Sequence, residues 1–156
     1  MKARKLSPAE LTQFNEIQIH YKRPPIDSLI KVVSAEDANA VLRSFIDLKR
    51  IDLKEFFWVI LLSNSNHVLG LSEISIGNSK GTVTNFREII QMALLSNSSA
   101  LIIAHNHPSG SLVPSKADLK VTEDLKQIVK VLDIELLDHL IITSEGFYSI
   151  VSKTDG

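Results

Sequence analysis

The sequence predicts an α/β fold in which helices flank one central mixed β-sheet. Three observations support this: short, strongly apolar runs typical of strands, segments between them with apolar residues at helical spacing, and 44% hydrophobic residues in a chain of 156. A chain of this size and composition is about one ordinary domain with its own core. We therefore predict a single α/β domain over residues 33–156. Residues 1–32 are predicted to be an N-terminal arm or appendage, because Pro24 and Pro25 fix an extended connection.

The amino-acid composition excludes some classes of function and makes others less favoured. The chain has 17 Lys and Arg against 18 Asp and Glu, so its net charge indicates no affinity for nucleic acid or membranes. It has no cysteine, which excludes disulfides and thiolate metal sites and leaves His, Asp and Glu as strong ligands. No apolar run approaches the roughly 20 residues that cross a bilayer, and the N-terminus lacks the apolar core of a signal peptide. We expect a cytoplasmic protein with no membrane partner, and the sequence does not indicate its oligomeric state.

Before residue 63 the sequence predicts a helix and a strand in the N-terminal arm, followed by a helix and a strand in the core. In the arm, Ser7 and Pro8 could start a short helix, and residues 17–21 alternate like a half-buried strand. Ser34 and Asp37 resemble a capping box at the start of the first core helix. Apolar residues then share one helical face: Ala38, Val41, Leu42, Phe45 and Leu48. The run Phe56 to Leu62 is typical of a strand buried on both faces.

The middle of the chain predicts a hairpin, a loop and a second helix. A turn at Asn64 to Asn66 leads to a second strand, Val68 to Ile76, as the hairpin partner of the first. Gly77 to Gly81 is predicted to be a loop. Asn85 and Glu88 then offer a second capping box, and the helix they start is predicted to stop at Ser96 and Asn97.

The last third predicts a strand, a helix and two more strands. Leu101 to Ala104 is short and apolar, as a buried strand is. A helix follows Pro114 and Ser115, with an apolar stripe at Val121, Leu125, Ile128, Val129 and Leu132. Leu136 to Thr143 and Phe147 to Val151 are predicted to be strands joined by a turn.

Three side chains suggest a metal site. His105 and His107 are two residues apart at the end of a strand, so they project to the same side and can bind one ion together. Asp118 falls within the apolar stripe of the next helix, where a carboxylate needs a partner. The alternatives are two histidines that simply flank a turn, and a capping box formed by Ser115 and Asp118. A cap and a metal ligand can also coexist.

Two imidazoles and one carboxylate suit Zn²⁺ and leave the fourth position open, which is the catalytic pattern. Such a site needs a general base, for which Glu55, Glu73 and Glu88 are candidates upstream. Glu88 is better explained by its cap. His139 lies in an apolar strand, so we predict a buried, hydrogen-bonded histidine outside the ligand set.

The spacing of these residues resembles a known signature. His105, His107, Ser115 and Asp118 fit the H-x-H-x(7)-S-x-x-D pattern of the JAMM (MPN+/JAB) metalloproteases. The strings HNHPSG, PS-x-x-D, Arg87-Glu88-Ile89 and Leu137-Asp138-His139 further resemble the RadC-like branch of that superfamily, from about Val33 to the end.

The resemblance implies a JAB/MPN, cytidine-deaminase-like core with one Zn²⁺ held by His105, His107 and Asp118. It implies hydrolysis of an amide or isopeptide bond in a peptide or protein substrate, with Ser115 bonded to the attacking water or the oxyanion. The superfamily pattern places its Glu some 45 to 55 residues before the first His, ahead of a buried strand, which selects Glu55, with Glu73 as runner-up. Two alternatives remain: a DNA-repair-associated or DNA-binding protein of the RadC type, and a catalytically silent interaction module. Clustered basic residues occur only near the N-terminus, so DNA is an unsupported partner.

Overall fold

A five-stranded mixed β-sheet forms the centre of the computed structural model, which describes residues 22, 25, 28–74, 76–77 and 83–151. The strand order is β2-β1-β5-β6-β7, and only β5 and β6 run parallel. The strands are β1 (Phe57–Leu62), β2 (Val68–Ile74), β5 (Ala100–Asn106), β6 (Glu135–Ile142) and β7 (Phe147–Ser149). A separate two-stranded ribbon joins β3 (Ile76–Gly77) and β4 (Val83–Thr84). The predicted α/β fold with a mixed sheet is confirmed.

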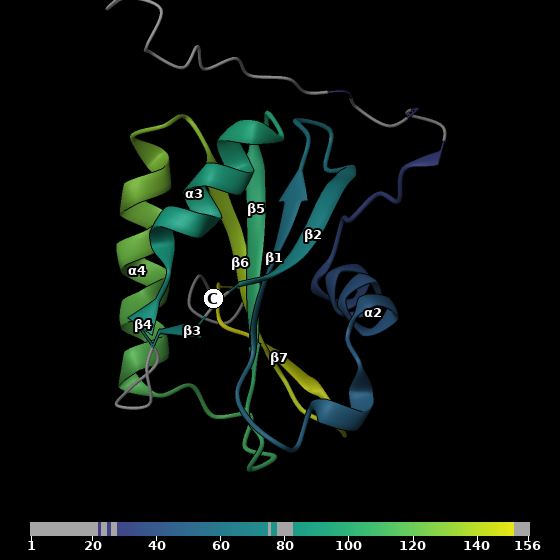
Figure 1. Ribbon diagram of the computed structural model, residues 1–156, viewed down its shortest axis with the longest axis vertical. Helices are drawn as coiled ribbons and strands as arrows, with labels where there is room; N and C mark the ends of the chain where they lie inside the picture. The colour runs from purple at the N-terminus through teal and green to yellow at the C-terminus, as the bar shows by residue number, and fades with distance from the viewer. Residues whose placement is uncertain (1–21, 23–24, 26–27, 75, 78–82, 152–156) are drawn as a thin grey trace, which may run out of the picture.

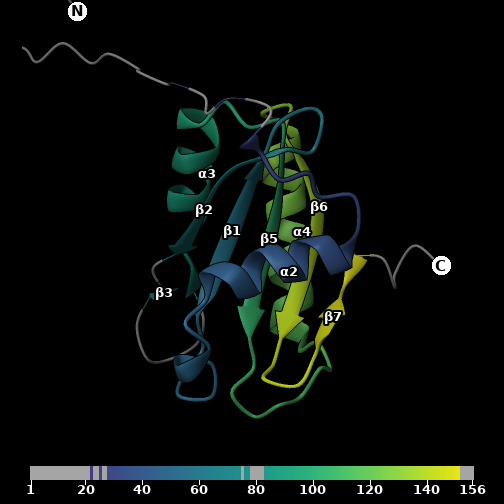
Figure 2. The same ribbon diagram turned by 90° about the vertical axis from the view of Figure 1, so that its right-hand side faces the viewer.

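Helices cover both faces of the sheet. They are α2 (Ala35–Phe45), the 3-10 turn η2 (Leu48–Arg50), α3 (Phe86–Leu95) and α4 (Lys116–Lys130). Seen edge-on, the sheet has α3 and α4 on one side and α2 on the other, and the turned view shows α2 in front of the sheet with α4 behind it (Figures 1 and 2). The parallel pair β5 and β6 is connected through α4, which fills the crossover that parallel strands require.

Side-chain alternation along the strands produces two apolar cores. Trp58, Ile60 and Ile102 point to the α2 side, while Val59, Leu61 and Ile103 point to the side of α3 and α4. All six residues of β1 are buried, as the unbroken apolar run predicts. Successive side chains of β5 therefore lie alternately in the two cores.

The predicted capping signals hold where they are described. Ser34 and Asp37 form a reciprocal capping box at α2, and the Asn85 side chain accepts a hydrogen bond from the backbone N–H of Glu88 at α3. Side chains at these positions satisfy backbone N–H groups that the helix itself leaves unbonded.

Three predicted details are wrong. The first core helix ends at Phe45, so Leu48 lies in η2, and both residues are about half exposed. The backbone becomes extended at Ile46, and Ile46 fills the core in their place. The strand predicted over Leu101 to Ala104 runs on through Asn106, and Gly77 belongs to β3. The helix and strand predicted before residue 22 lie outside the described residues.

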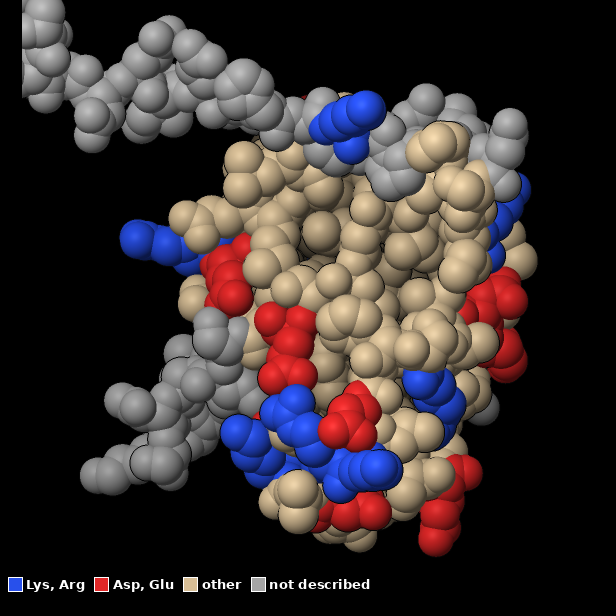
Figure 3. Space-filling model, turned by 45° about the vertical axis from the view of Figure 1, so that its right-hand side comes forward, with Lys and Arg blue, Asp and Glu red and all other residues tan. Residues whose placement is uncertain are grey.

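The surface carries charges of both signs. Lys and Arg side chains at the lower end of the face in Figure 3 lie among Asp and Glu side chains. Arg50 and Glu73 form one pair of opposite charges, with 3.7 Å between Nη2 and Oε1. Within the part of the chain that the structure describes, no helix is both long and apolar enough to cross a membrane.

Leu125 should be a main anchor of α4 to the sheet, since it is fully buried in the core on that side. Leu125→Ala should lower the free energy of unfolding by about 2–5 kcal/mol, through lost burial and the cavity left behind. Urea denaturation measures this. The matched control Leu94→Ala, on the exposed face of α3, should change stability by less than about 0.5 kcal/mol.

Candidate metal centre

His105, His107 and Asp118 converge at the end of β5 and the start of α4. The Nε2 atoms of the two histidines are 2.9 Å apart. Asp118 Oδ1 lies 3.2 Å from His105 Nε2, and Asp118 Oδ2 lies 3.5 Å from His107 Nε2. Among the described residues this is the one cluster of three His, Cys, Asp or Glu side chains able to hold a metal ion.

The strand and the helix together set this geometry. His105 and His107 share the α4 side because they are two residues apart, and His105 stacks on the ring of Phe57 across the strand pair. After His107, a turn closes with a hydrogen bond from the N–H of Gly110 to the carbonyl of His107. Gly110 has a φ of 78°, a conformation that favours glycine, and it lets the chain double back toward α4.

Asp118 is both a cap and a candidate ligand. Ser115 and Asp118 form the predicted capping box: Asp118 Oδ2 accepts from the N–H of Ser115 at 2.7 Å, and Ser115 Oγ accepts from the N–H of Asp118 at 3.1 Å. These bonds fix the carboxylate so that Oδ1 faces His105. The cap therefore leaves Asp118 in the candidate metal cluster, and capping does not exclude a role as a ligand.

The electrostatics of Asp118 favour its ionised form. Partial burial acts to raise the pKa of Asp118, but the hydrogen bond and charge of His105 and the hydrogen bonds from Ser115 outweigh it. The pKa of Asp118 therefore lies well below its ordinary value. A carboxylate that stays charged can balance a bound cation.

The second nitrogen of each histidine is bonded on its outer side. His107 Nδ1 lies 2.8 Å from the carbonyl oxygen of Ser111, and His105 Nδ1 lies 2.8 Å from His139 Nε2. A carbonyl oxygen only accepts, so His107 donates from Nδ1, and in the neutral ring its Nε2 carries the lone pair. Metal-binding histidines show this same arrangement.

The donor set fits a zinc ion. At Zn–N and Zn–O distances near 2.0–2.2 Å, tetrahedral ligand atoms are about 3.3 Å apart. This is close to the 2.9 Å between the two Nε2 atoms and to the 3.2 Å between His105 Nε2 and Asp118 Oδ1. His105, His107 and Asp118 are thus suited to hold Zn²⁺ and would leave a fourth position open.

Asn106 lies between the two histidines and faces the opposite side of β5. It is fully buried, and its Oδ1 accepts a hydrogen bond from the N–H of Phe56 at 2.6 Å. Its Nδ2 donates to the carbonyls of Ile51 and Lys54. One side chain thus fixes the backbone of the segment that carries Glu55.

The strand register separates the predicted base candidates. Phe57 is opposite His105, and the N–H of Asn106 bonds the carbonyl of Phe56, so continuing this register puts half-buried Glu55 opposite His107. Glu73 is opposite Trp58, which puts it on the other face of the sheet, away from the histidines. Glu73 is therefore on the wrong face of the sheet for the cluster, and Glu55 stays the predicted base. Glu88 Oε2 accepts a hydrogen bond from Nδ2 of Asn85, so the side chain of Glu88 pairs with the side chain of Asn85 and not with the backbone N–H that a capping box would use.

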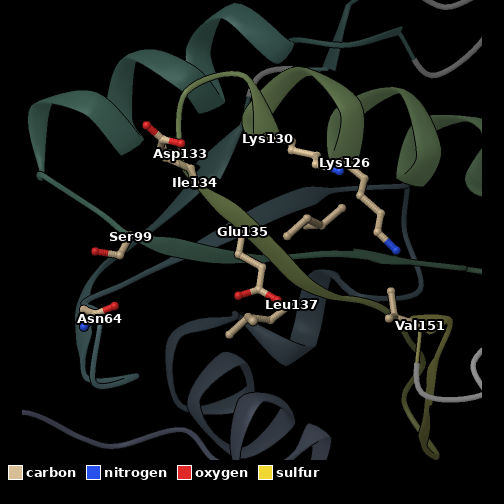
Figure 4. A pocket seen from close by; sticks show the side chains of 10 residues that line it. Asn64, Ser99, Lys126, Lys130, Asp133, Ile134, Glu135, Leu137 and Val151 are labelled. Atoms are coloured by element: carbon tan, nitrogen blue, oxygen red, sulfur yellow. The ribbon is translucent and has the colours of Figure 1, made fainter.

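A cavity of about 750 Å³ lies elsewhere, at the starts of β5 and β6 (Figure 4). Lys126, Lys130, Glu135 and Val151 are among its lining residues. It contains none of the cluster residues, because it adjoins the opposite ends of the two parallel strands.

Comparison with known proteins gives the family. The family description "RadC-like JAB domain" matches residues 32–155. The chain belongs to this family. It is 39% identical over 126 residues to a UPF0758 protein of Flavobacterium johnsoniae, covering 80% of this chain and 53% of that protein. It is 43% identical over 100 residues to one of Desulfitobacterium hafniense, covering 64% and 44%, and 38% identical over 124 residues to one of Coprothermobacter proteolyticus, covering 79% and 53%. The chain thus spans about half the length of these curated relatives.

In this RadC-like JAB domain, sequence analysis missed two supporting residues. The only sequence signal for Asn106 is its position between two same-facing histidines, which turns it to the other side of the strand. The signal for Thr122 is its position one helical turn after Asp118, on the same face of α4. His139 is buried and hydrogen-bonded, as predicted, and the structure identifies His105 as one partner. Burial lowers the pKa of His139 well below its ordinary value, with the nearby charge of His105 acting in the same direction.

Asn106→Ala should destabilise the RadC-like JAB domain by about 3 kcal/mol or more. The variant leaves the N–H of Phe56 and the carbonyls of Ile51 and Lys54 without this partner in a buried place, at about 1–3 kcal/mol for each unsatisfied group. Urea denaturation measures the change, and Asn64→Ala, at an exposed turn, serves as the control. Equal stability of the two variants would show that the Asn106 bonds contribute little.

Proposed function

We propose that this RadC-like JAB domain is a zinc-dependent hydrolase that cleaves an amide or isopeptide bond in a peptide or protein. The observation that carries the proposal is the convergence of two imidazole nitrogens and one carboxylate: one ligand atom from each of the three residues lies within 4.8 Å of the others. Such a three-ligand set is typical of catalytic zinc sites, which keep one position for water or substrate. Family membership supports the same activity class.

The three residues of the cluster differ in how far their side chains are exposed to solvent. The His105 side chain is only 2% exposed, while those of His107 and Asp118 are 16% and 13% exposed. A substrate carbonyl would therefore approach from the side of His107 and Asp118. Continuing the register of β1 by two residues would put Glu55 on that side, opposite His107.

When bound, Zn²⁺ would polarise the scissile carbonyl and lower the pKa of a water molecule toward about 7. Glu55 would accept the proton of the attacking water and deliver it to the leaving nitrogen as the C–N bond breaks. Ser115 Oγ accepts from the N–H of Asp118, so its own hydrogen can be donated to the developing oxyanion. Asp118 and the two histidines would hold the metal throughout.

Two other functions considered from the sequence remain as alternatives: a DNA-binding protein and a catalytically silent interaction module. On the face shown in Figure 3, basic side chains lie among acidic ones, and a nucleic-acid surface would need clustered positive charge. A silent interaction module would keep the fold without turnover. The metal content and the effect of replacing Glu55 distinguish these possibilities.

The purified protein should contain close to one zinc ion per chain by elemental analysis. His107→Ala and Asp118→Ala should each lose most of it, because each removes one of three ligands. His67→Ala, which changes a histidine outside the cluster, should keep it. Absence of zinc from the wild type after incubation with Zn²⁺, or selective retention of iron, would contradict the proposal.

Glu55→Gln should retain zinc but lower kcat at least about 100-fold, because an amide cannot shuttle the proton. The assay uses the zinc-loaded protein on a panel of amide-linked and isopeptide-linked fluorogenic peptides. Glu73→Gln is the matched control, and it should keep the wild-type rate because Glu73 belongs to the opposite face of the sheet. A full rate in Glu55→Gln would contradict the assignment of the base. A zinc-loaded wild type that cleaves no member of the panel would favour the interaction module.

A further inference from the structure

A chain of hydrogen bonds leads from the backbone carbonyl of Asp118 in α4, through Thr122 and His139, to His105. Thr122 Oγ1 lies 2.7 Å from the carbonyl oxygen of Asp118 and 2.6 Å from His139 Nδ1. His139 Nε2 lies 2.8 Å from His105 Nδ1. Thr122, His139 and His105 are all buried, at 8%, 1% and 1% exposure, so bulk water does not replace these bonds.

The direction of the first two bonds follows from the chemistry of their ends. A carbonyl oxygen has no hydrogen, so the Thr122 hydroxyl must donate to Asp118. Its single hydrogen is then used, and Thr122 Oγ1 can only accept from His139. His139 therefore carries its hydrogen on Nδ1.

The last bond follows in the same way. A neutral imidazole with hydrogen on Nδ1 has a lone pair on Nε2, so His139 Nε2 accepts from His105 Nδ1. In its neutral form His105 then has its hydrogen on the outer nitrogen and its lone pair on Nε2, 3.2 Å from Asp118 Oδ1. The opposite tautomer would point an N–H into the centre of the cluster.

We propose that Thr122 and His139 form a relay that fixes His105 in the tautomer able to bind a metal through Nε2. They are positioning residues, since neither is part of the three-residue cluster. His107 reaches the same tautomer independently, through the carbonyl of Ser111. The part of this inference that concerns zinc rests on the proposed function, whereas the tautomer of His105 does not.

Through the relay, the hydroxyl of Thr122 on α4 controls the tautomer of His105 on β5. In Thr122→Val the hydroxyl is lost at nearly constant side-chain shape, and the helical backbone keeps its own bonds. His139 then has no acceptor at Nδ1 and can adopt either tautomer, and His105 follows it. Part of the population presents an N–H where a metal must bind, so affinity falls.

The first test is nitrogen NMR of the histidine rings in the metal-free protein at pH 8. The wild type should show hydrogen on Nδ1 of both His105 and His139. In Thr122→Val part of the population should lose the hydrogen from Nδ1 of both rings, and Thr122→Ser, which restores a hydroxyl, should return them to the wild-type pattern. A wild-type His105 or His139 without hydrogen on Nδ1 overturns the relay, and this result needs neither zinc binding nor hydrolysis.

The second test is zinc affinity measured by competition with a chelator. Thr122→Val should bind Zn²⁺ about 10–100-fold more weakly than the wild type, the usual effect of removing a group that orients a metal ligand. Thr122→Ser should recover most of the affinity. Thr143→Val makes the same chemical change at another buried threonine, which bonds Gly146 and not the histidines, so it should bind zinc normally.

The two tests separate the relay from the proposed function. If the wild type binds no zinc but shows the expected tautomers, the hydrolase proposal fails and the relay stands. If Thr122→Val binds zinc as tightly as the wild type, or if Thr143→Val loses as much affinity as Thr122→Val, the relay is overturned. A Thr122→Val variant that does not fold leaves the decision to the wild-type tautomers and to Thr122→Ser.

Discussion

The tripeptide His105-Asn106-His107, which ends β5 and continues one residue beyond it, determines how the site is built, because side chains alternate across an extended chain. His105 and His107 face α4, and Asn106 faces the opposite core. These three residues therefore supply two candidate ligands on one face and, on the other, the side chain of Asn106. Asn106 is hydrogen-bonded to the backbone of the segment that contains Glu55, so the proposed metal site and the proposed base are positioned from the same three residues.

The start of α4 also uses one side chain, that of Asp118, for two purposes. Asp118 occupies the third position of the helix, where an acidic side chain both bonds a free backbone N–H and benefits from the positive end of the helix dipole. Those bonds use Oδ2 and orient Oδ1 toward His105. The helix therefore orients the carboxylate before any ion is present, which lowers the cost of ordering it on binding.

Sequence analysis succeeded where the relevant contacts are local. The apolar run before Leu62, the capping boxes at Ser34 and Ser115, and the His105, His107 and Asp118 cluster all lie within short stretches of chain. Their geometry follows from strand alternation and helical spacing alone. The helix over residues 38–48 was predicted too long because apolar spacing does not reveal where the backbone leaves the helix, at Ile46.

The missed features depend on contacts between distant parts of the chain. Asn106 bonds Ile51 and Lys54 more than 50 positions away, and the pairing of His139 with His105 requires β6 to lie parallel to β5. Strand order also puts Glu73, opposite Trp58, on the face of the sheet away from the histidines. Residue type and spacing can thus identify the side chains that would bind a metal. The residues that orient those side chains become visible only once the order and direction of the strands are known.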